Sequence, residues 1–79
     1  MKLHLSYYGI LTELAGKSAE NLVLDENADI QTLETHLTSK YPDFGQYPLV
    51  FFADQTMCSP ETPLTNNQKV ECMPPFAGG

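Results

Sequence analysis

The spacing of apolar positions divides the chain into short strands and one longer helix. Apolar and polar residues alternate from residue 2 to residue 8, which is typical of a strand with one buried face. Further strands are predicted at residues 21–24, 49–53, 56–58 and 70–73, with a turn at Asp54-Gln55. Residues 59–68 are rich in Pro, Thr and Asn and are predicted to form a loop.

Two helical patterns lie between the strands. Apolar residues recur every three or four positions on one face of the longer helix: Ile30, Leu33 and Leu37. This spacing predicts a helix over 30–40, with Asp29 as its N-cap, and a shorter helical segment over 10–14 is expected to end at Gly16. Because a helix with one apolar stripe needs a sheet to cover, the sequence predicts an α+β fold with a mixed sheet and one principal helix.

Composition and charge narrow the range of partners. The 79 residues fit a single domain, and 42% hydrophobic against 18% charged residues indicate a folded globule. The chain has ten acidic residues, four lysines and no arginine, which gives it a net charge of −6. Because it has few cations to bind phosphate groups, we expect neither nucleic acid nor an anionic membrane as a partner, and a basic protein fits better. No apolar run is long enough to span a bilayer, and a strand pattern stands where a signal peptide would be, so we expect a cytoplasmic location.

Side chains with reactive groups are scattered along the chain. The cysteines and histidines stand singly: His4, His36, Cys58 and Cys72. This spacing favours neither a nucleophilic triad nor a zinc site, so we expect small buried thiols and histidines on polar or interface faces. The carboxylates show no paired arrangement and are expected to be solvated: Glu13, Glu20, Asp25, Glu26, Glu34 and Asp54. We therefore expect no catalytic residue, no metal site and no bound cofactor of the chain's own.

The end of the chain is the most distinctive segment. It consists of two prolines, two residues of differing size and two glycines: Pro74, Pro75, Phe76, Ala77, Gly78 and Gly79. Proline has no N–H to donate, so strand pairing should stop at the diproline and leave a tail with a reach of about 20 Å at full extension. Glycine has no Cβ, so a second protein can close around the backbone and reach the last carboxyl group. The tail therefore predicts a chain that is a substrate or carrier for a partner's active site.

This tail resembles that of the ubiquitin-like sulfur carriers, and among them the small subunits of molybdopterin synthase. Further motifs match in order and spacing: Glu13-Leu14-Ala15-Gly16, Asp29-Ile30, Asp54-Gln55-Thr56 and Pro63-Leu64. The resemblance covers nearly the whole chain. It implies a β-grasp domain over residues 1–73, with a mixed sheet wrapped around the principal helix, and an extended tail over 74–79.

The resemblance also implies a reaction sequence. Gly79 would be adenylated by an ATP-dependent activating enzyme, converted to a thiocarboxylate and inserted into the large catalytic subunit, while Pro74 to Gly78 thread the entrance. Sulfur would then pass to precursor Z to build the dithiolene of molybdopterin. The implied assembly is a heterotetramer of two small and two large subunits, in which the small subunit is non-catalytic and ATP is used only by the activating enzyme.

An aromatic pair in the predicted strand over 49–53 is a candidate for partner contact. Phe51 and Phe52 are adjacent, so they point to opposite faces of the sheet and at most one can enter the core on the helix side. We hypothesise that Phe52 faces the partner. The alternative is that a loop of the chain itself covers Phe52.

Two other functions remain open from the sequence. The same tail could donate sulfur to thiazole or another metabolite, or join the chain to lysines as a protein modifier. A third interpretation is an acidic protein-binding module. It differs in predicting that deletion of Gly78 and Gly79 leaves activity unchanged.

Overall fold

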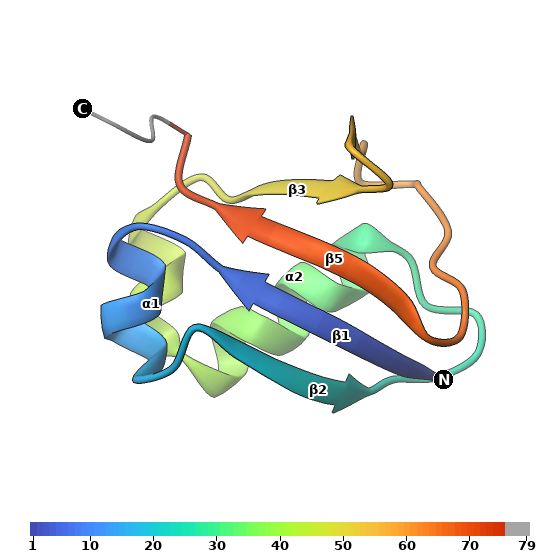
Figure 1. Cartoon of the computed structure of the whole chain (residues 1–79), viewed down its shortest axis with the longest axis horizontal. Helices are drawn as coiled ribbons and strands as arrows, with labels where there is room; N and C mark the ends of the chain where they lie inside the picture. Colours follow the sequence, from blue (N-terminus) through green and yellow to red (C-terminus); the bar gives the residue numbers. More distant parts are fainter. Residues whose placement is uncertain (76–79) are drawn as a thin grey trace.

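A computed structural model describes residues 1–75, which form one mixed sheet with a helix across one face (Figure 1). The strands are β1 (Lys2–Tyr7), β2 (Ala19–Val23), β3 (Val50–Ala53), β4 (Thr56–Met57) and β5 (Gln68–Met73). Their order in the sheet is β2-β1-β5-β3-β4, with β1 parallel to β5 and the other neighbours antiparallel. The helices are α1 (Ile10–Ala15), α2 (Ile30–Lys40) and the 3-10 helix η1 (Pro42–Gln46).

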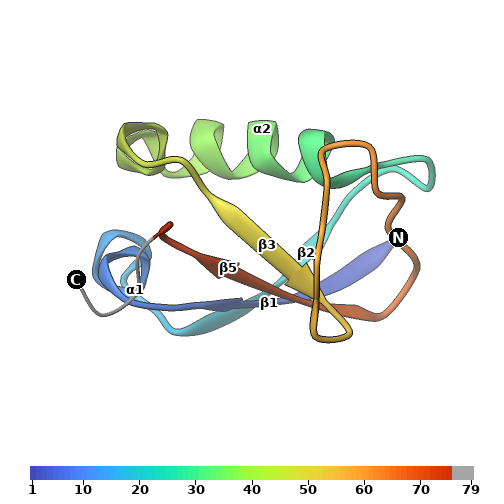
Figure 2. The same ribbon diagram turned by 90° about the horizontal axis from the view of Figure 1, so that it is seen from above.

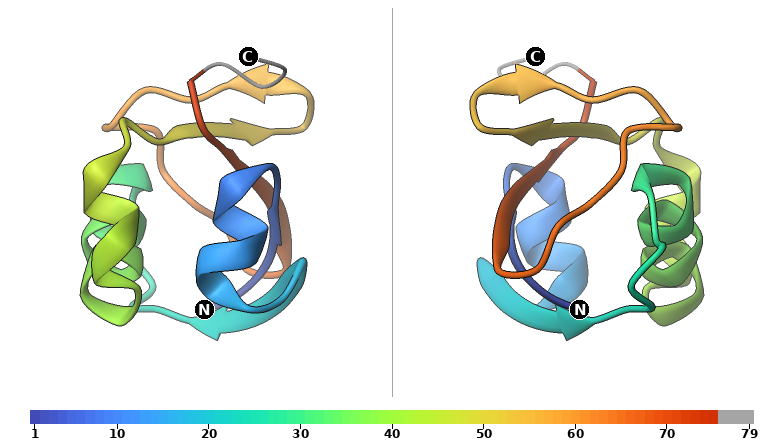
Figure 3. Two further views of the ribbon diagram at one scale, coloured as in Figure 1. Left: turned by 90° about the vertical axis from the view of Figure 1, so that its left-hand side faces the viewer. Right: turned by 90° about the vertical axis from the view of Figure 1, so that its right-hand side faces the viewer.

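The sheet curves around α2, which lies along its concave side (Figures 2 and 3). The apolar stripe of α2 is buried against the sheet, with Leu33 and Leu37 fully inaccessible and Ile30 3% exposed. On the sheet, alternate residues of β1 and β5 face the same core, as the burial of Leu3, Leu5 and Val70 shows. The α+β fold expected from the sequence, a mixed sheet around one principal helix, is confirmed.

Local signals set the ends of the helices. The carboxylate of Asp29 accepts a hydrogen bond from the backbone N–H of Thr32 at 2.9 Å, which satisfies a donor that the first turn of α2 leaves free. Gly16 ends α1 in the left-handed conformation at φ 75°, and its N–H bonds to the carbonyl of Thr12 at 3.0 Å. Both predicted caps are confirmed.

One core element was not predicted. Phe44 lies in η1 and is fully buried, with its ring edge-on to Tyr7 at 5.6 Å between centroids and tilted against Tyr41 at 4.9 Å. A single aromatic between Asp43 and Gly45 has no period, so no pattern in the sequence marks it as core. The three rings close the end of the core next to α1.

Strand ends differ from the predictions by one or two residues. β1 stops at Tyr7, β4 stops at Met57, and β2 and β5 begin two residues earlier than predicted, at Ala19 and Gln68. The expectation of buried thiols holds for Cys72 and is wrong for Cys58, which packs against the core but is only partly buried. Within residues 1–75, neither α-helix is long and apolar enough to cross a membrane.

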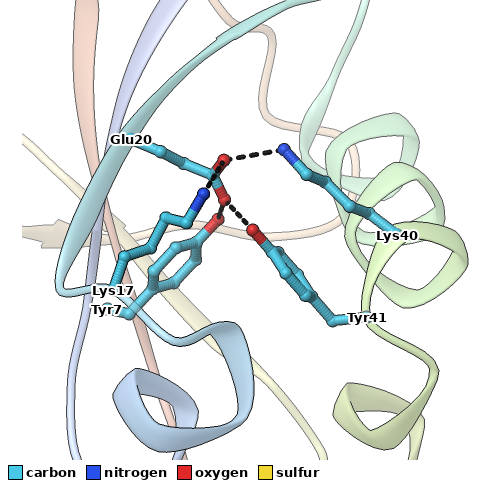
Figure 4. A network of polar contacts seen from close by, with 5 residues as sticks. All are labelled: Tyr7, Lys17, Glu20, Lys40 and Tyr41. Carbon is cyan, nitrogen blue, oxygen red and sulfur yellow. Dashed lines mark hydrogen bonds and ion pairs between the residues drawn. The ribbon is translucent and has the colours of Figure 1, made fainter.

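The expectation that Glu20 is a solvated carboxylate is wrong. Its side chain is only 9% exposed and accepts hydrogen bonds from the hydroxyls of Tyr7 and Tyr41 (2.6 Å for Tyr41) and from the ammonium group of Lys40 at 2.7 Å (Figure 4). Glu20 pairs with Leu5 across β1 and β2, so its side chain points to the same inner face as that of Leu5. The cluster of Tyr7, Glu20, Lys40 and Tyr41, here called the Glu20 network, ties the edge of the sheet to the end of α2.

Hydrogen bonding sets the charge state of this network. Burial alone would raise the pKa of Glu20, but the hydrogen bonds from Lys40, Tyr41 and Tyr7 outweigh it and lower the pKa from 4.5 to about 2. Burial and the bond to Glu20 together raise the pKa of the Tyr7 hydroxyl above its usual value. Near neutral pH the carboxylate is therefore charged and both hydroxyls are protonated donors.

Candidate functional site: the root of the C-terminal tail

The predicted tail begins at the end of β5, the middle strand of the sheet, on the side of the molecule where α1 lies (Figure 1). β5 ends at Met73, directly before Pro74 and Pro75, and its last register partners are Tyr7 on β1 (opposite Cys72) and Val50 on β3 (opposite Met73). Pro74 is partly buried, whereas Pro75 is exposed. The other predicted tail residues, Phe76, Ala77, Gly78 and Gly79, lie outside the described residues. Residues 73–75 are called the tail root below.

The segment between β1 and α1 packs against the tail root. The backbone N–H of Tyr8 donates to the carbonyl of Cys72 at 3.2 Å, and the Tyr8 hydroxyl donates to Glu71 at 2.8 Å. The bond to Glu71 raises the pKa of the Tyr8 hydroxyl, so it stays a donor near neutral pH. Gly9 follows with φ 60° and ψ −138°, and a Cβ on it would lie 3.2 Å from Cγ of Pro74. The Tyr8-Gly9 segment and the tail root are thus in direct contact, and this contact is called the junction below.

Phe51 and Phe52 point to opposite faces of the sheet, as predicted. Phe51 is 3% exposed and belongs to the core, while Phe52 is partly exposed on the outer face, the side away from α2. Phe52 lies opposite Met57 on β4 and opposite Glu71 on β5. The contact of Phe52 with a partner stays a prediction.

Other apolar side chains share the outer face with Phe52. We call them the outer patch: Tyr8, Val50, Phe52, Met57 and Met73. Met57 is 64% exposed and Tyr8 is 41% exposed, and the patch continues into the tail root through Met73. The sequence alone indicated only Phe52, because the other members join it through the register of four strands.

The cysteines and histidines do not come together. Cys72 lies on the inner face of β5, and burial raises the pKa of its thiol to about 12, so it is not a nucleophile near neutral pH. His4 points to the outer face of β1, where its Nδ1 lies 2.7 Å from Oδ1 of Asn21. His36 lies on α2, where it lines a shallow pocket with residues of α2 and of the β2–α2 connection and with no cysteine. Among residues 1–75, no group of three or more His, Cys, Asp or Glu side chains is arranged to hold a metal ion.

Comparison with protein families gives a match that includes the tail. The model described as the ThiS family matches residues 5–79 of this chain. The chain belongs to the ThiS family. The comparison with curated proteins gave no match.

Solved structures that match this chain over nearly its whole length share the fold. A Pyrococcus furiosus protein assigned as molybdopterin converting factor subunit 1 superposes with a TM-score of 0.89 at 19% identity, covering 96% of this chain and 99% of that one. Small archaeal modifier protein 1 from Haloferax volcanii gives a TM-score of 0.84 at 12% identity, covering 95% and 98%. A chain from the complex of subunits 1 and 2 of the molybdopterin-converting factor of Helicobacter pylori gives 0.70 at 13% identity, covering 100% of both. These likenesses confirm the β-grasp, ubiquitin-like fold that the sequence motifs implied.

Proposed function

We propose that this ThiS-family chain is the sulfur-carrying small subunit of a molybdopterin synthase and that Gly79 carries the sulfur. The observation that carries the proposal is the extent of the family match, which runs through the Pro-Pro-Phe-Ala-Gly-Gly ending to residue 79. The similarity in fold to molybdopterin converting factor subunit 1 supports the same pathway.

The chemistry takes place at the Gly79 carboxylate in two steps. A carboxylate oxygen first attacks the α-phosphate of ATP in an activating enzyme, which forms an acyl-adenylate and releases pyrophosphate. A sulfide-level nucleophile then attacks the acyl carbon and displaces AMP, leaving a thiocarboxylate. This chain supplies the acyl group and binds no cofactor, while the partner supplies the nucleotide site.

The thiocarboxylate then reacts inside the large subunit. Its sulfur attacks a carbon of precursor Z and displaces an oxygen substituent from that carbon. Water then cleaves the acyl–sulfur bond, which leaves the sulfur on the pterin and restores the Gly79 carboxylate. Because a dithiolene contains two sulfur atoms, two charged carriers are consumed for each molecule of molybdopterin. Gly78 and Ala77 are small enough for a narrow entrance, and Pro74 to Phe76 bridge the distance to the globular domain.

The outer patch is the proposed docking surface for the large subunit. It holds exposed Met57 and half-buried Phe52 next to the tail root, so a partner that covers the patch also receives the tail. An interface of this kind buries its apolar anchors at the centre and leaves a polar rim. The Helicobacter pylori neighbour, described as a complex of subunits 1 and 2, supports a large-subunit partner, and we propose a heterotetramer with two copies of each in the cytoplasm.

A modifier function is the second candidate. It is favoured by the likeness in fold to small archaeal modifier protein 1. In this case the activated Gly79 is attacked by a lysine amine, and AMP leaves as an isopeptide bond forms. A ladder of conjugates in cell extract would support it, whereas sulfur transfer to thiazole or another metabolite would leave no ladder and no molybdopterin.

A reconstituted reaction tests the proposal. Chain prepared with a thiocarboxylate at Gly79 is mixed with its large subunit and precursor Z, and molybdopterin is measured. We expect about one molecule of product for every two carriers consumed. A chain truncated after Ala77 is the control, and the proposal fails if the charged carrier gives no product or the truncated chain gives as much. The acidic binding-module interpretation predicts equal results for both chains.

A further inference from the structure

We propose that Gly9 is a positioning residue that sets the direction in which the tail leaves the domain. The inference rests on the proposed function and names a residue outside the tail on which that function depends. It starts from the junction between the Tyr8-Gly9 segment and the tail root.

The backbone of Gly9 is in a conformation that other residues avoid. Its φ of 60° and ψ of −138° lie in a region open to glycine and strained for any residue with a Cβ. Gly9 is the N-cap of α1 and has no side chain to offer, but its carbonyl accepts a hydrogen bond from the backbone N–H of Thr12 at 3.1 Å. This conformation also turns the chain toward the end of β5.

The turn places Gly9 directly beside the ring of Pro74. An added Cβ would lie 3.2 Å from Cγ and 3.6 Å from Cδ of Pro74, closer at Cγ than ordinary van der Waals contact. The hydrogen bond from Tyr8 N–H to Cys72 carbonyl and the bond from Tyr8 hydroxyl to Glu71 hold the two segments together on either side. Pro74 therefore packs against a position where glycine, which has no Cβ, avoids the close contact.

The geometry indicates that a small movement at this contact causes a larger movement at the end of the tail. Proline fixes its own φ, so the direction of Pro74 is passed on to the residues that follow. When the residues that follow keep their conformation, a rotation of about 10° at Pro74 displaces a point about 20 Å further along the chain by about 3.5 Å. A displacement of this size at the reacting carboxyl group is enough to slow a positioned reaction by about tenfold or more.

Gly16 provides a control for a Cβ at a positive φ. It also has a positive φ, at 75°, and flanks the other end of α1, but a Cβ on it would meet no atom within 4 Å. Gly9→Ala and Gly16→Ala both place a Cβ at a positive φ, but Gly16 is in the left-handed helical region, which costs alanine less than the conformation of Gly9. Only Gly9→Ala also brings a Cβ to 3.2 Å from the ring of Pro74, where the ring must shift to relieve the close contact. The Pro74→Ala background therefore separates backbone strain at Gly9 from contact with Pro74.

The experiment measures tail activation in four variants and the wild type. Wild type, Gly9→Ala, Gly16→Ala, Pro74→Ala and the double variant Gly9→Ala/Pro74→Ala are assayed for kcat/KM with the activating enzyme, ATP and sulfide, at a temperature where each is folded. Gly9→Ala should lower kcat/KM by about tenfold or more, and Gly16→Ala should change it by less than about twofold. Alanine at position 74 lacks Cγ and Cδ, so Gly9→Ala should have little effect in the Pro74→Ala background.

Two results would overturn the inference. One is an equal loss of kcat/KM from Gly9→Ala in both backgrounds, and the other is a loss no larger than that of Gly16→Ala. A wild-type chain that is not activated at all would contradict the proposed function instead. The contact itself is tested independently by nuclear Overhauser effects between the Gly9 Hα and Pro74 ring protons, and their absence in the wild type would refute it. If Gly9→Ala does not fold, the inference is tested by this measurement and by the Pro74→Ala variant.

Discussion

Replacing Glu20 with alanine should destabilise the domain, although the loss of a carboxylate from an edge strand ordinarily changes the free energy of unfolding little. Glu20 accepts a hydrogen bond from Tyr7, which is only 3% exposed, so the substitution leaves a buried hydroxyl without its partner. Tyr41 and Lys40 lose the same acceptor, but they are more exposed and can turn to water.

Two ways of estimating the loss give a similar magnitude. An unsatisfied buried hydroxyl costs about 1–3 kcal/mol. A pKa lowered from 4.5 to about 2 corresponds to about 3.4 kcal/mol of linked stability at full strength. The side chain of Lys40 is 41% exposed, so solvent screening reduces this value by roughly half. We therefore expect Glu20→Ala to lower the free energy of unfolding by about 2 kcal/mol.

Urea unfolding at pH 7 measures the loss, with Glu13→Ala as control. Glu13 is an exposed carboxylate of α1 that lies outside the Glu20 network, so its removal should change stability by less than about 0.5 kcal/mol. In a Tyr7→Phe background, which has no hydroxyl to leave unpaired, Glu20→Ala should cost about 1 kcal/mol less. Equal losses for Glu20→Ala and Glu13→Ala would refute the reasoning.

The pH dependence has a definite sign. Because the folded-state pKa of Glu20 is below its unfolded value, its contribution is present above about pH 5 and is lost as the pH falls toward about 2. The stabilities of wild type and Glu20→Gln should therefore converge between about pH 5 and pH 2. A difference that stays constant over this range would show that the charge of Glu20 is not responsible.

Two further predictions concern the sheet face and the helix cap. Phe52→Ala should weaken binding to the large subunit by about tenfold with less than about 1 kcal/mol of lost stability, whereas the neighbouring Phe51→Ala should cost about 3–4 kcal/mol in urea unfolding because it opens a cavity in the core. The reverse pattern would place the partner contact elsewhere. Asp29→Ala should lower stability by about 1 kcal/mol by removing the cap of α2, and Asp29→Asn should retain most of it; an equal loss in both would mean that charge and not capping is involved.

Local signals were sufficient to predict α2 to the residue. Asp29 marks its start, the apolar stripe marks its buried face, and Lys40 followed by Tyr41-Pro42 marks its end. The same reasoning predicted the turn at Asp54-Gln55, where both residues have positive φ. These features depend on neighbours within about four positions, which a sequence shows directly.

Features that depend on register were not predicted. Glu20 lies 13 residues from Tyr7 and 21 residues from Tyr41, so only the pairing of β1 with β2 and the packing of α2 bring them together. One signal was available, because Glu20 alternates with Leu22 and therefore shares its inward face. The contact of Gly9 with Pro74 spans most of the chain, and nothing in the sequence relates the two positions.

The central claim is that the Gly79 carboxylate exchanges an oxygen for sulfur, and the intact mass of the chain tests it most directly. After incubation with the activating enzyme, ATP and sulfide, a chain that ends at Gly79 should gain about 16 Da, and the gain should be confined to the C-terminal peptide and require ATP. A mass that does not change under these conditions, or a gain that persists when Gly78 and Gly79 are deleted, would contradict the account.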